Sequence, residues 1–267
     1  MTMGLGSGLE GKVAIVTGGG AEADGIGNGR ASAMLLAEGG ARVLVVDRSI
    51  ERAERTVAMI EDNGGEALAL FADVTDDAGA REIAQTAHDR WGRLDILNNN
   101  VGIGSRGSVV EQSEQGWDQV MRVNVTSMFL CSKYAIPLME ESGGGAIVNV
   151  SSISALRPRG LTAYSTSKGA VIALTRAMAV DHGPAGVRVN CIAPGPMFTP
   201  MVNRGGMTAQ ARANRRDASV LGIEGTGWDI GHAVCYLCSE RARYVTGHVL
   251  VVDGGATMRG PERESAG

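Results

Sequence analysis

Tyr164 and Lys168 stand four residues apart within residues 161–182, a segment that we expect to be helical. One helical turn separates them, so both side chains project from the same face. A tyrosine hydroxyl has a pKa of about 10, and a nearby cation favours its ionised form and lowers that pKa. The spacing therefore predicts a proton-transferring pair, although an amphipathic face with a snorkelling lysine has the same spacing.

Two adjacent serines could orient a substrate oxygen beside that pair. Ser151 and Ser152 end the apolar run Gly145–Ser152 (GAIVNVSS), which predicts a buried strand. A hydroxyl beyond the end of this strand could hydrogen-bond a reacting oxygen. Ser151 precedes Tyr164 by 13 residues and Ser152 precedes it by 12, so both are candidates.

Glycines follow the first apolar run, Lys12–Gly18 (KVAIVTG), at Gly18–Gly20 and again at Gly25-Ile26-Gly27, where a helix opens. Glycines here permit a tight turn and let backbone N–H groups approach a pyrophosphate. Asp47 ends the next apolar run, where a carboxylate can accept hydrogen bonds from the adenosine ribose. These features together predict a dinucleotide-binding site.

Asp47 also favours NAD over NADP as the cofactor. A 2′-phosphate would place a second negative charge against this carboxylate. Asp24, just before Gly25, adds further negative charge nearby. Arg48 is the counter-argument, because its side chain could turn toward a phosphate.

Strand-like and helical segments alternate along nearly the whole chain. The expected strands are 12–18, 41–47, 66–74, 94–100, 145–152, 187–194 and 248–253, and the expected helices are 27–38, 49–63, 76–91, 113–139, 161–182 and 228–239. We expect Pro137 to interrupt the fourth helix and residues 195–227 to be irregular or loosely helical. The strands are apolar throughout, so both faces of the sheet should be covered. Such alternation predicts parallel strands with right-handed crossovers.

The fold class that follows is α/β. We predict a single-domain Rossmann fold over residues 1–267, in which a doubly wound seven-stranded parallel sheet carries helices on both faces. Flexible tails are expected at about 1–8 and 259–267. A mobile substrate lid is expected at about 196–226.

These motifs resemble those of the short-chain dehydrogenase/reductases over about residues 9–257. The matching residues are Thr17-Gly18 with Gly25-Ile26-Gly27, Asp73-Val74, Asn99-Asn100-Val101-Gly102, Asn124, Ser151-Ser152, Tyr164 with Lys168, Pro194-Gly195 with Thr199, and Val252-Asp253-Gly254-Gly255. The resemblance implies that Asp73 and Val74 contact adenine. It also implies that Asn100, Val101 and Gly102 close over the cofactor, and that Pro194, Gly195 and Thr199 hold the nicotinamide amide.

The resemblance further implies an NAD-dependent oxidoreductase that interconverts a secondary alcohol and a ketone. Asn124, Ser152, Tyr164 and Lys168 would be catalytic, with Asn124 holding a water that links Lys168 to solvent. Tyr164 and Lys168 would also contact the cofactor. A homotetramer is expected, built through helices near 113–140 and 161–182 and the last strand.

The chain departs from the family pattern at two places. Six residues, Gly19 to Asp24, separate Thr17-Gly18 from Gly25 where the family has three. We expect Glu22 and Asp24 in this longer loop to face outward, because carboxylates would repel a pyrophosphate. The family's catalytic serine usually has the spacing of Ser151, but the strand context VNVSS resembles cases in which the second serine acts. We therefore favour Ser152 and keep Ser151 as the alternative.

Charge and composition exclude several other functions. The net charge is −4 without a long basic run, which argues against nucleic acid, and no apolar stretch approaches the length of a membrane span. Cys235 and Cys238 form a C-x-x-C, but no second such pair occurs, so buried reduced thiols are preferred over a zinc or redox site. The four histidines show no pair at ligand spacing, so no metal is expected. Unpaired cysteines and the absence of a secretory h-region favour the cytoplasm. No G-x-S-x-G occurs, which excludes a nucleophile elbow. A non-catalytic, nucleotide-binding regulatory protein of the same fold stays the alternative.

Arginines are frequent in the loops expected to line the substrate, among them Arg106, Arg157, Arg212 and Arg215. They would suit an acidic substrate. Solvated surface positions are the simpler interpretation, and we prefer it.

Overall fold

The computed structural model describes residues 7–203 and 206–260. The expected flexible tails therefore lie largely outside the described residues. No helix in the described ranges is long and apolar enough to cross a membrane.

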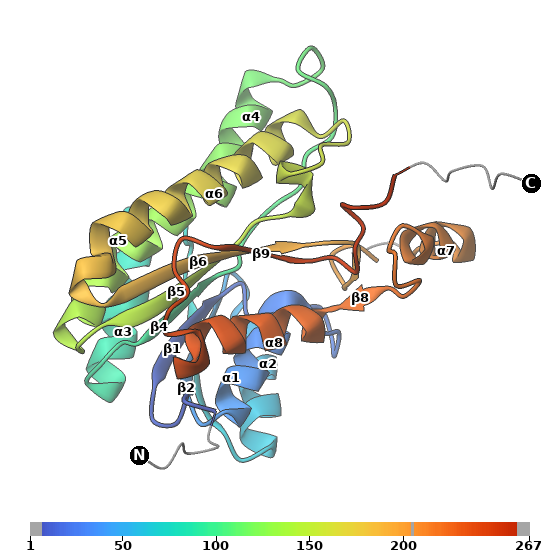
Figure 1. Cartoon of the computed structure of the whole chain (residues 1–267). Helices are drawn as coiled ribbons and strands as arrows, with labels where there is room; N and C mark the ends of the chain where they lie inside the picture. The colour runs from blue at the N-terminus through green and yellow to red at the C-terminus, as the bar shows by residue number, and fades with distance from the viewer. Residues whose placement is uncertain (1–6, 204–205, 261–267) are drawn as a thin grey trace, which may run out of the picture.

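Seven parallel strands form the central sheet in the order β3-β2-β1-β4-β5-β6-β9, which confirms the predicted fold class (Figure 1). The strands are β1 (Val13–Thr17), β2 (Arg42–Asp47), β3 (Glu66–Phe71), β4 (Ile96–Asn99), β5 (Gly145–Val150), β6 (Val187–Pro194) and β9 (Val249–Val252). The strand order reverses between β1 and β4. Thr17 pairs with Val46 on one side and with Asn99 on the other, so the carboxyl ends of these strands meet at one edge.

Helices cover both faces of this sheet (Figure 1). One face carries α1 (Asn28–Glu38), α2 (Ile50–Asp62) and α8 (Gly227–Cys238), and the other carries α3 (Asp77–Trp91), α5 (Ser127–Glu141) and α6 (Thr162–His182). Alternate residues of the strands serve the two cores. Val16 and Val148 belong to the core under α1 and α8, whereas Ile15 and Ile147 belong to the opposite core. Burial on both faces explains why the strands are uniformly apolar.

The helix expected at 113–139 differs from the prediction in two ways. It comprises α4 (Glu114–Met121), a π-helical turn at Arg122–Thr126, and α5, which continues through Pro137 to Glu141. The expected interruption at Pro137 is therefore wrong. Ile136 and Met139 on either side of it are buried in the core, so tertiary packing outweighs the missing N–H. The π turn is instead the irregular part, and such turns are frequent at functional sites.

The segment at 195–227 is more ordered than expected. It contains the short strands β7 (Met197–Phe198) and β8 (Gly225–Thr226), which pair in parallel, and the helix α7 (Ala209–Asp217). α7 projects beyond the end of the sheet (Figure 1). Thr208 caps it by accepting a hydrogen bond from the N–H of Ala211 at 3.1 Å. The side-chain cap is a local signal that could have predicted this helix.

Candidate active site

The predicted site residues gather along the carboxyl edge of the sheet. Gly18 follows β1, Asp47 ends β2, Asn100 follows β4 and Ser151 follows β5. Because the strand order reverses between β1 and β4, the connections on either side diverge and leave a crevice there. This is the place where a ligand of such a sheet binds.

The glycine-rich loop enters α1 one residue later than the sequence predicted. Helix α1 begins at Asn28, with Gly27 as its N-cap, so Gly25 and Ile26 lie in the loop. A Cβ atom on Gly29 would collide with the carbonyl oxygen of Gly18. Gly27 and Gly29 therefore take the positions that permit close packing of helix on strand. The prediction missed Gly29, although a glycine two residues after Gly27 was a visible signal.

Because Gly27 is the N-cap of α1, the loop before the helix is longer than the sequence motif indicated. Eight residues, from Gly19 to Ile26, lie between Gly18 and Gly27. Gly18 has a φ of +64°, which favours glycine. A Cβ on Gly25 would collide with the ring of Pro200, so the far end of the loop abuts the segment after β7.

Asp47 is held against the start of this loop. Its Oδ2 accepts a hydrogen bond from the N–H of Gly20 at 3.1 Å, and its Oδ1 accepts one from Ser49 at 3.1 Å. A Cβ on Gly20 would stand 2.7 Å from Asp47 Oδ2, so only glycine permits this approach. The loop and the β2 carboxylate thus form one unit at the end of the crevice beside β2.

The two acidic residues of the loop face α2. Glu22 pairs with Arg52 at 3.2 Å, and Asp24 pairs with Arg55 at 2.7 Å. Their negative charges are therefore drawn toward the arginines of α2 and away from the N-terminus of α1. This arrangement matches the expectation that they point outward.

Asn100 and Asp73 lie on either side of the same crevice. The Asn100 side chain donates to the carbonyl oxygens of Thr17 at 3.2 Å and Gly18 at 3.1 Å, and so fastens β4 to the glycine loop. Asp73 Oδ1 accepts hydrogen bonds from the N–H and hydroxyl of Thr75, both at 2.8 Å. Val74 is buried in the core, so only its backbone is free to face a ligand.

Tyr164 and Lys168 lie on α6 as the spacing predicted. Lys168 is 3% exposed, and its Nζ donates to the carbonyl oxygen of Val150 at 2.8 Å. The same Nζ stands 5.8 Å from the centre of the Tyr164 ring. Burial lowers the pKa of Lys168 to about 8. Burial also raises the pKa of Tyr164, against an opposing hydrogen bond with Ser152, so the expected lowering does not occur in the protein alone.

The two candidate serines have different surroundings. The Ser152 hydroxyl lies near Tyr164, where it lowers the pKa of the phenol, and it accepts the N–H of Ser154 at 3.1 Å. The Ser151 hydroxyl is buried and donates to the carbonyl oxygen of Lys168 at 2.7 Å, inside α6. Ser152 therefore faces the tyrosine hydroxyl, whereas Ser151 joins β5 to the helix backbone.

Asn124 lies in the π-helical turn and is fully buried. Its side-chain amide forms two hydrogen bonds with the backbone of Ile103: it donates to the carbonyl oxygen at 2.9 Å and accepts from the N–H at 2.7 Å. It also donates to Ser167 on α6 at 2.9 Å. A Cβ on Gly102 would stand 3.0 Å from Lys168 Nζ and 3.4 Å from Asn124 Oδ1, so this glycine fits between the two polar groups.

Pro194 ends β6, and Gly195 and Thr199 follow it. The N–H of Gly195 donates to the carbonyl oxygen of Val252 at 2.9 Å, and a Cβ on Gly195 would stand 2.5 Å from the Cα of Asp253. Thr199 is buried and accepts the N–H groups of Val202 and Asn203, both at 3.0 Å. The last strand therefore fixes the path of this loop toward the crevice.

The arginines of α7 are occupied within the protein. Glu224 accepts hydrogen bonds from Arg212 at 2.9 Å and Arg215 at 3.3 Å. Arg212 also stacks on the ring of Phe198 at 4.0 Å, and Arg215 donates to the carbonyl oxygen of Met197 at 2.7 Å. These two arginines fasten α7 to the β7–β8 pair, so their presence does not argue for an acidic substrate.

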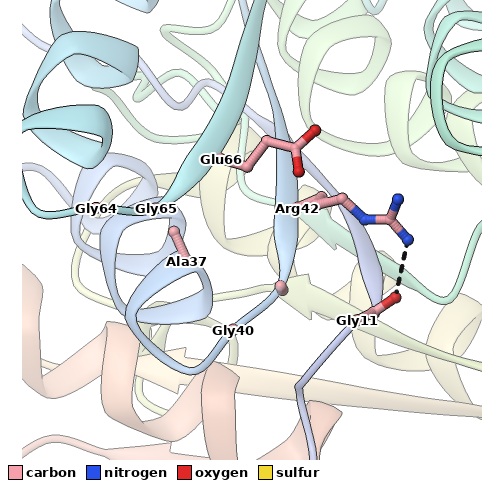
Figure 2. A pocket seen from close by; sticks show the side chains of 8 residues that line it. Gly11, Ala37, Gly40, Arg42, Gly64, Gly65 and Glu66 are labelled. Atoms are coloured by element: carbon pink, nitrogen blue, oxygen red, sulfur yellow. Dashed lines mark hydrogen bonds between the residues drawn. The ribbon is translucent and has the colours of Figure 1, made fainter.

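A surface hollow lies at the opposite end of the sheet (Figure 2). It is lined by glycines together with Ala37, Arg42 and Glu66, and Arg42 donates across it to the carbonyl oxygen of Gly11 at 3.2 Å. Arg42 and Glu66 begin β2 and β3, so the hollow is at the amino ends of these strands. Ligands of open α/β sheets bind beyond the carboxyl ends, and we assign no chemistry to it.

No group of three histidine, cysteine, aspartate or glutamate side chains suited to a metal ion occurs among the described residues. All four cysteines are free. Cys235 and Cys238 lie on α8 facing its core, and burial raises the pKa of the Cys235 thiol to about 12. Their C-x-x-C spacing thus belongs to helix packing.

Comparison with known proteins agrees with this architecture. Residues 19–257 match a family model described as Enoyl-(Acyl carrier protein) reductase. The 2-(S)-hydroxypropyl-CoM dehydrogenase 3 of Xanthobacter autotrophicus is 40% identical over 255 residues, which cover 93% of this chain and 98% of that protein. A short-chain dehydrogenase/reductase structure from Burkholderia xenovorans superposes with a TM-score of 0.90 at 39% identity, covering 96% of this chain and all of that one.

A second solved structure holds both a cofactor and a steroid. It is a 7α-hydroxysteroid dehydrogenase complexed with NADH and 7-oxo glycochenodeoxycholic acid, with a TM-score of 0.87, 34% identity, and coverage of 93% of this chain and 96% of that one. The sheet order, the carboxyl-edge crevice and these similarities lead to one assignment. The chain belongs to the short-chain dehydrogenase/reductase family and is an oxidoreductase.

Proposed function

We propose that this enzyme interconverts a secondary alcohol and a ketone with NAD as the hydride carrier and Tyr164 as the acid/base. One observation carries the proposal: Tyr164 lies near Ser152 and beside the buried ammonium of Lys168, at the carboxyl edge of the sheet. A nicotinamide cofactor is supported by the family and by the related structure complexed with NADH.

The residues present fit a dinucleotide. Gly18, Gly27 and Gly29 bring backbone close to the N-terminus of α1, where a pyrophosphate is favoured by free N–H groups and the helix dipole. Asp47 would hold the adenosine ribose, and Asp73 and Val74 would flank the adenine. Asn100, Val101 and Gly102 would close over the cofactor. Pro194, Gly195 and Thr199 would hold the nicotinamide amide.

A bound nicotinamide would supply the hydride chemistry at the carbinol carbon. Tyr164 takes the hydroxyl proton during oxidation and returns it during reduction. Ser152 donates a hydrogen bond to the substrate oxygen and thereby orients it. Lys168 keeps a positive charge on the same face of α6, which favours the ionised tyrosine against the effect of burial.

Asn124 has two roles in the proposed mechanism: it positions the loop after β4, and it helps to supply protons to Lys168. Its grip on Ile103 holds the loop after β4 against α6 and encloses Lys168. The family resemblance adds a water held by Asn124, through which Lys168 would exchange protons with solvent.

NAD is proposed over NADP because the positive charges near the adenosine end are already paired. Arg52 is bound by Glu22, and Arg48 lies 4.0 Å from Asp73. Asp47, at the end of β2, would repel a 2′-phosphate. A 2′-phosphate beside Asp47 would therefore be repelled by this carboxylate, while the nearby arginines are already paired with acids.

Replacing Tyr164 by phenylalanine should abolish turnover while preserving shape. We expect kcat to fall by about a hundredfold or more, because the acid/base is removed. The measurement is absorbance at 340 nm with NAD(H) and a panel of secondary alcohols and ketones. NADH binding, followed by fluorescence titration, should persist in Tyr164→Phe, and near-normal turnover in this variant would refute the assignment.

Substitution of the two serines should have different effects, one on turnover and the other on stability. Ser152→Ala should lower kcat by about a hundredfold, as expected for a lost oxyanion donor, with little change in unfolding free energy. Ser151→Ala should keep most of the turnover but lose roughly 1 kcal/mol of stability, because a buried hydrogen bond to α6 is lost. Parallel kinetics and urea unfolding test both. The opposite pattern would make Ser151 the catalytic serine.

The cofactor preference should depend on Asp47. The wild-type protein should show kcat/KM for NAD at least about tenfold above that for NADP, and Asp47→Ser should narrow the ratio by removing like-charge repulsion. Asp62→Ser, an exposed carboxylate at the far end of α2, is the matched control and should leave the ratio unchanged. A wild-type preference for NADP would contradict the proposal.

The lowered pKa of Lys168 should affect how the unfolding free energy of the protein without cofactor depends on pH. Burial lowers that pKa from 10.5 to about 8, so charging the folded lysine costs stability below pH 8. From about pH 8 to 10.5 the unfolded chain binds the extra proton, and stability rises with pH. We expect the unfolding free energy of wild type minus that of Lys168→Met to increase by roughly 3 kcal/mol across this range. A difference that stays flat would contradict the buried, depressed lysine.

A further inference from the structure

Arg30 lies fully buried on the first turn of α1, directly behind the glycine-rich loop. Its Nη1 donates to the carbonyl oxygens of Ala23 at 2.7 Å and Gly25 at 2.8 Å, and its Nη2 donates to that of Ala21 at 3.0 Å. A buried cation is tolerated only when its donors are satisfied. Here the acceptors are three alternate carbonyls of one loop, so the guanidinium dictates the path of that loop.

Thr56 on α2 extends the same network. Its hydroxyl accepts a hydrogen bond from Arg30 Nε at 2.9 Å and donates to the carbonyl oxygen of Gly19, also at 2.9 Å. The loop is thus held at four carbonyls, from Gly19 to Gly25, by two buried side chains. The exposed pairs of Glu22 and Asp24 with α2 lie on the outside and should contribute little by comparison.

The orientation of these carbonyls determines where the N–H groups point. No cis peptide bond occurs in the described residues, and in a trans peptide the carbonyl and the following N–H point in opposite directions. The N–H groups of Glu22, Asp24 and Ile26 therefore point away from the guanidinium. Among the described residues, no carboxylate forms an ion pair or hydrogen bond with Arg30. Asp24 and Asp47 interact with its charge only through space, so that charge can still favour an anion at the N-terminus of α1.

We infer that Arg30 is a positioning residue that shapes the loop at residues 19–26 and thereby sets its affinity for the pyrophosphate of the cofactor. The inference rests on the nucleotide site of the proposed function. Eight residues are more backbone than a tight turn requires, and ordering them only on binding would cost affinity. A buried cation that orders them beforehand removes that cost.

The test compares Arg30→Met with wild type in the absence and presence of nucleotides. Without cofactor, hydrogen exchange of amides 19–27 should become faster. The Kd values for NADH and ADP should rise about tenfold to hundredfold, as expected for loss of hydrogen bonds to a charged group, whereas that for adenosine should change less than about twofold. KM for NAD should rise more than kcat falls. Arg30→Lys, which keeps the charge but fewer donors, should be intermediate.

Arg188→Met is the matched control. Arg188 is a partly buried arginine on β6 that likewise donates to carbonyl oxygens, those of Leu237 and Ser239, at the other end of the sheet. This variant should lose stability without changing loop exchange or the Kd for ADP. If Arg30→Met fails to fold, Thr56→Val removes the link to Gly19 and should act in the same direction.

The inference would be overturned if Arg30→Met kept wild-type loop exchange and wild-type ADP affinity. It would also be overturned if Arg188→Met showed the same faster loop exchange and weaker ADP binding as Arg30→Met. Failure of the proposed function is a separate outcome. Wild-type protein that binds neither NADH nor ADP would overturn the nucleotide site. Hydrogen exchange of amides 19–27 without cofactor tests the effect of Arg30 on the loop, whether or not a nucleotide binds.

Discussion

The hydrogen bond from Lys168 Nζ to the carbonyl oxygen of Val150 joins the chemistry of α6 to the end of β5. A buried ammonium is costly unless an acceptor meets it, and here the acceptor is the last residue of a strand. The strand thus fixes how far α6 can slide or rotate. Because Ser152 follows the same strand and Tyr164 precedes Lys168 by one turn, this single contact aligns all three groups.

Other parts of the fold make room for that contact. Gly102 leaves space beside the ammonium, and the π turn carries Asn124 to the backbone of Ile103. The same amide donates to Ser167 on α6, so the loop after β4 is joined to that helix. The irregular turn in the long helix therefore serves the site, whereas Pro137 is an exposed position within α5.

The sequence predicted those features whose causes are local. The apolar strands, the spacing of Tyr164 and Lys168, and Asp47 at a strand end all follow from short-range pattern. The start of α1 was wrong by one residue, and Gly29 was missed, because the contact with Gly18 joins residues separated by the whole loop. The raised pKa of Tyr164 and the role of Arg30 could not be predicted, since both depend on burial by segments distant in sequence.

The extended loop separates two kinds of cation around the adenosine half of the crevice. Arg52 and Arg55 are bound by the carboxylates of Glu22 and Asp24, so their charge is largely neutralised on the α2 side of the loop. Arg30 is bound by neutral carbonyls, so its charge is retained beneath the N-terminus of α1. The proposed preference for NAD rests on this arrangement, with the acids outside the loop and the carbonyls inside it. The extra length that departs from the family pattern is what supplies both sets of partners.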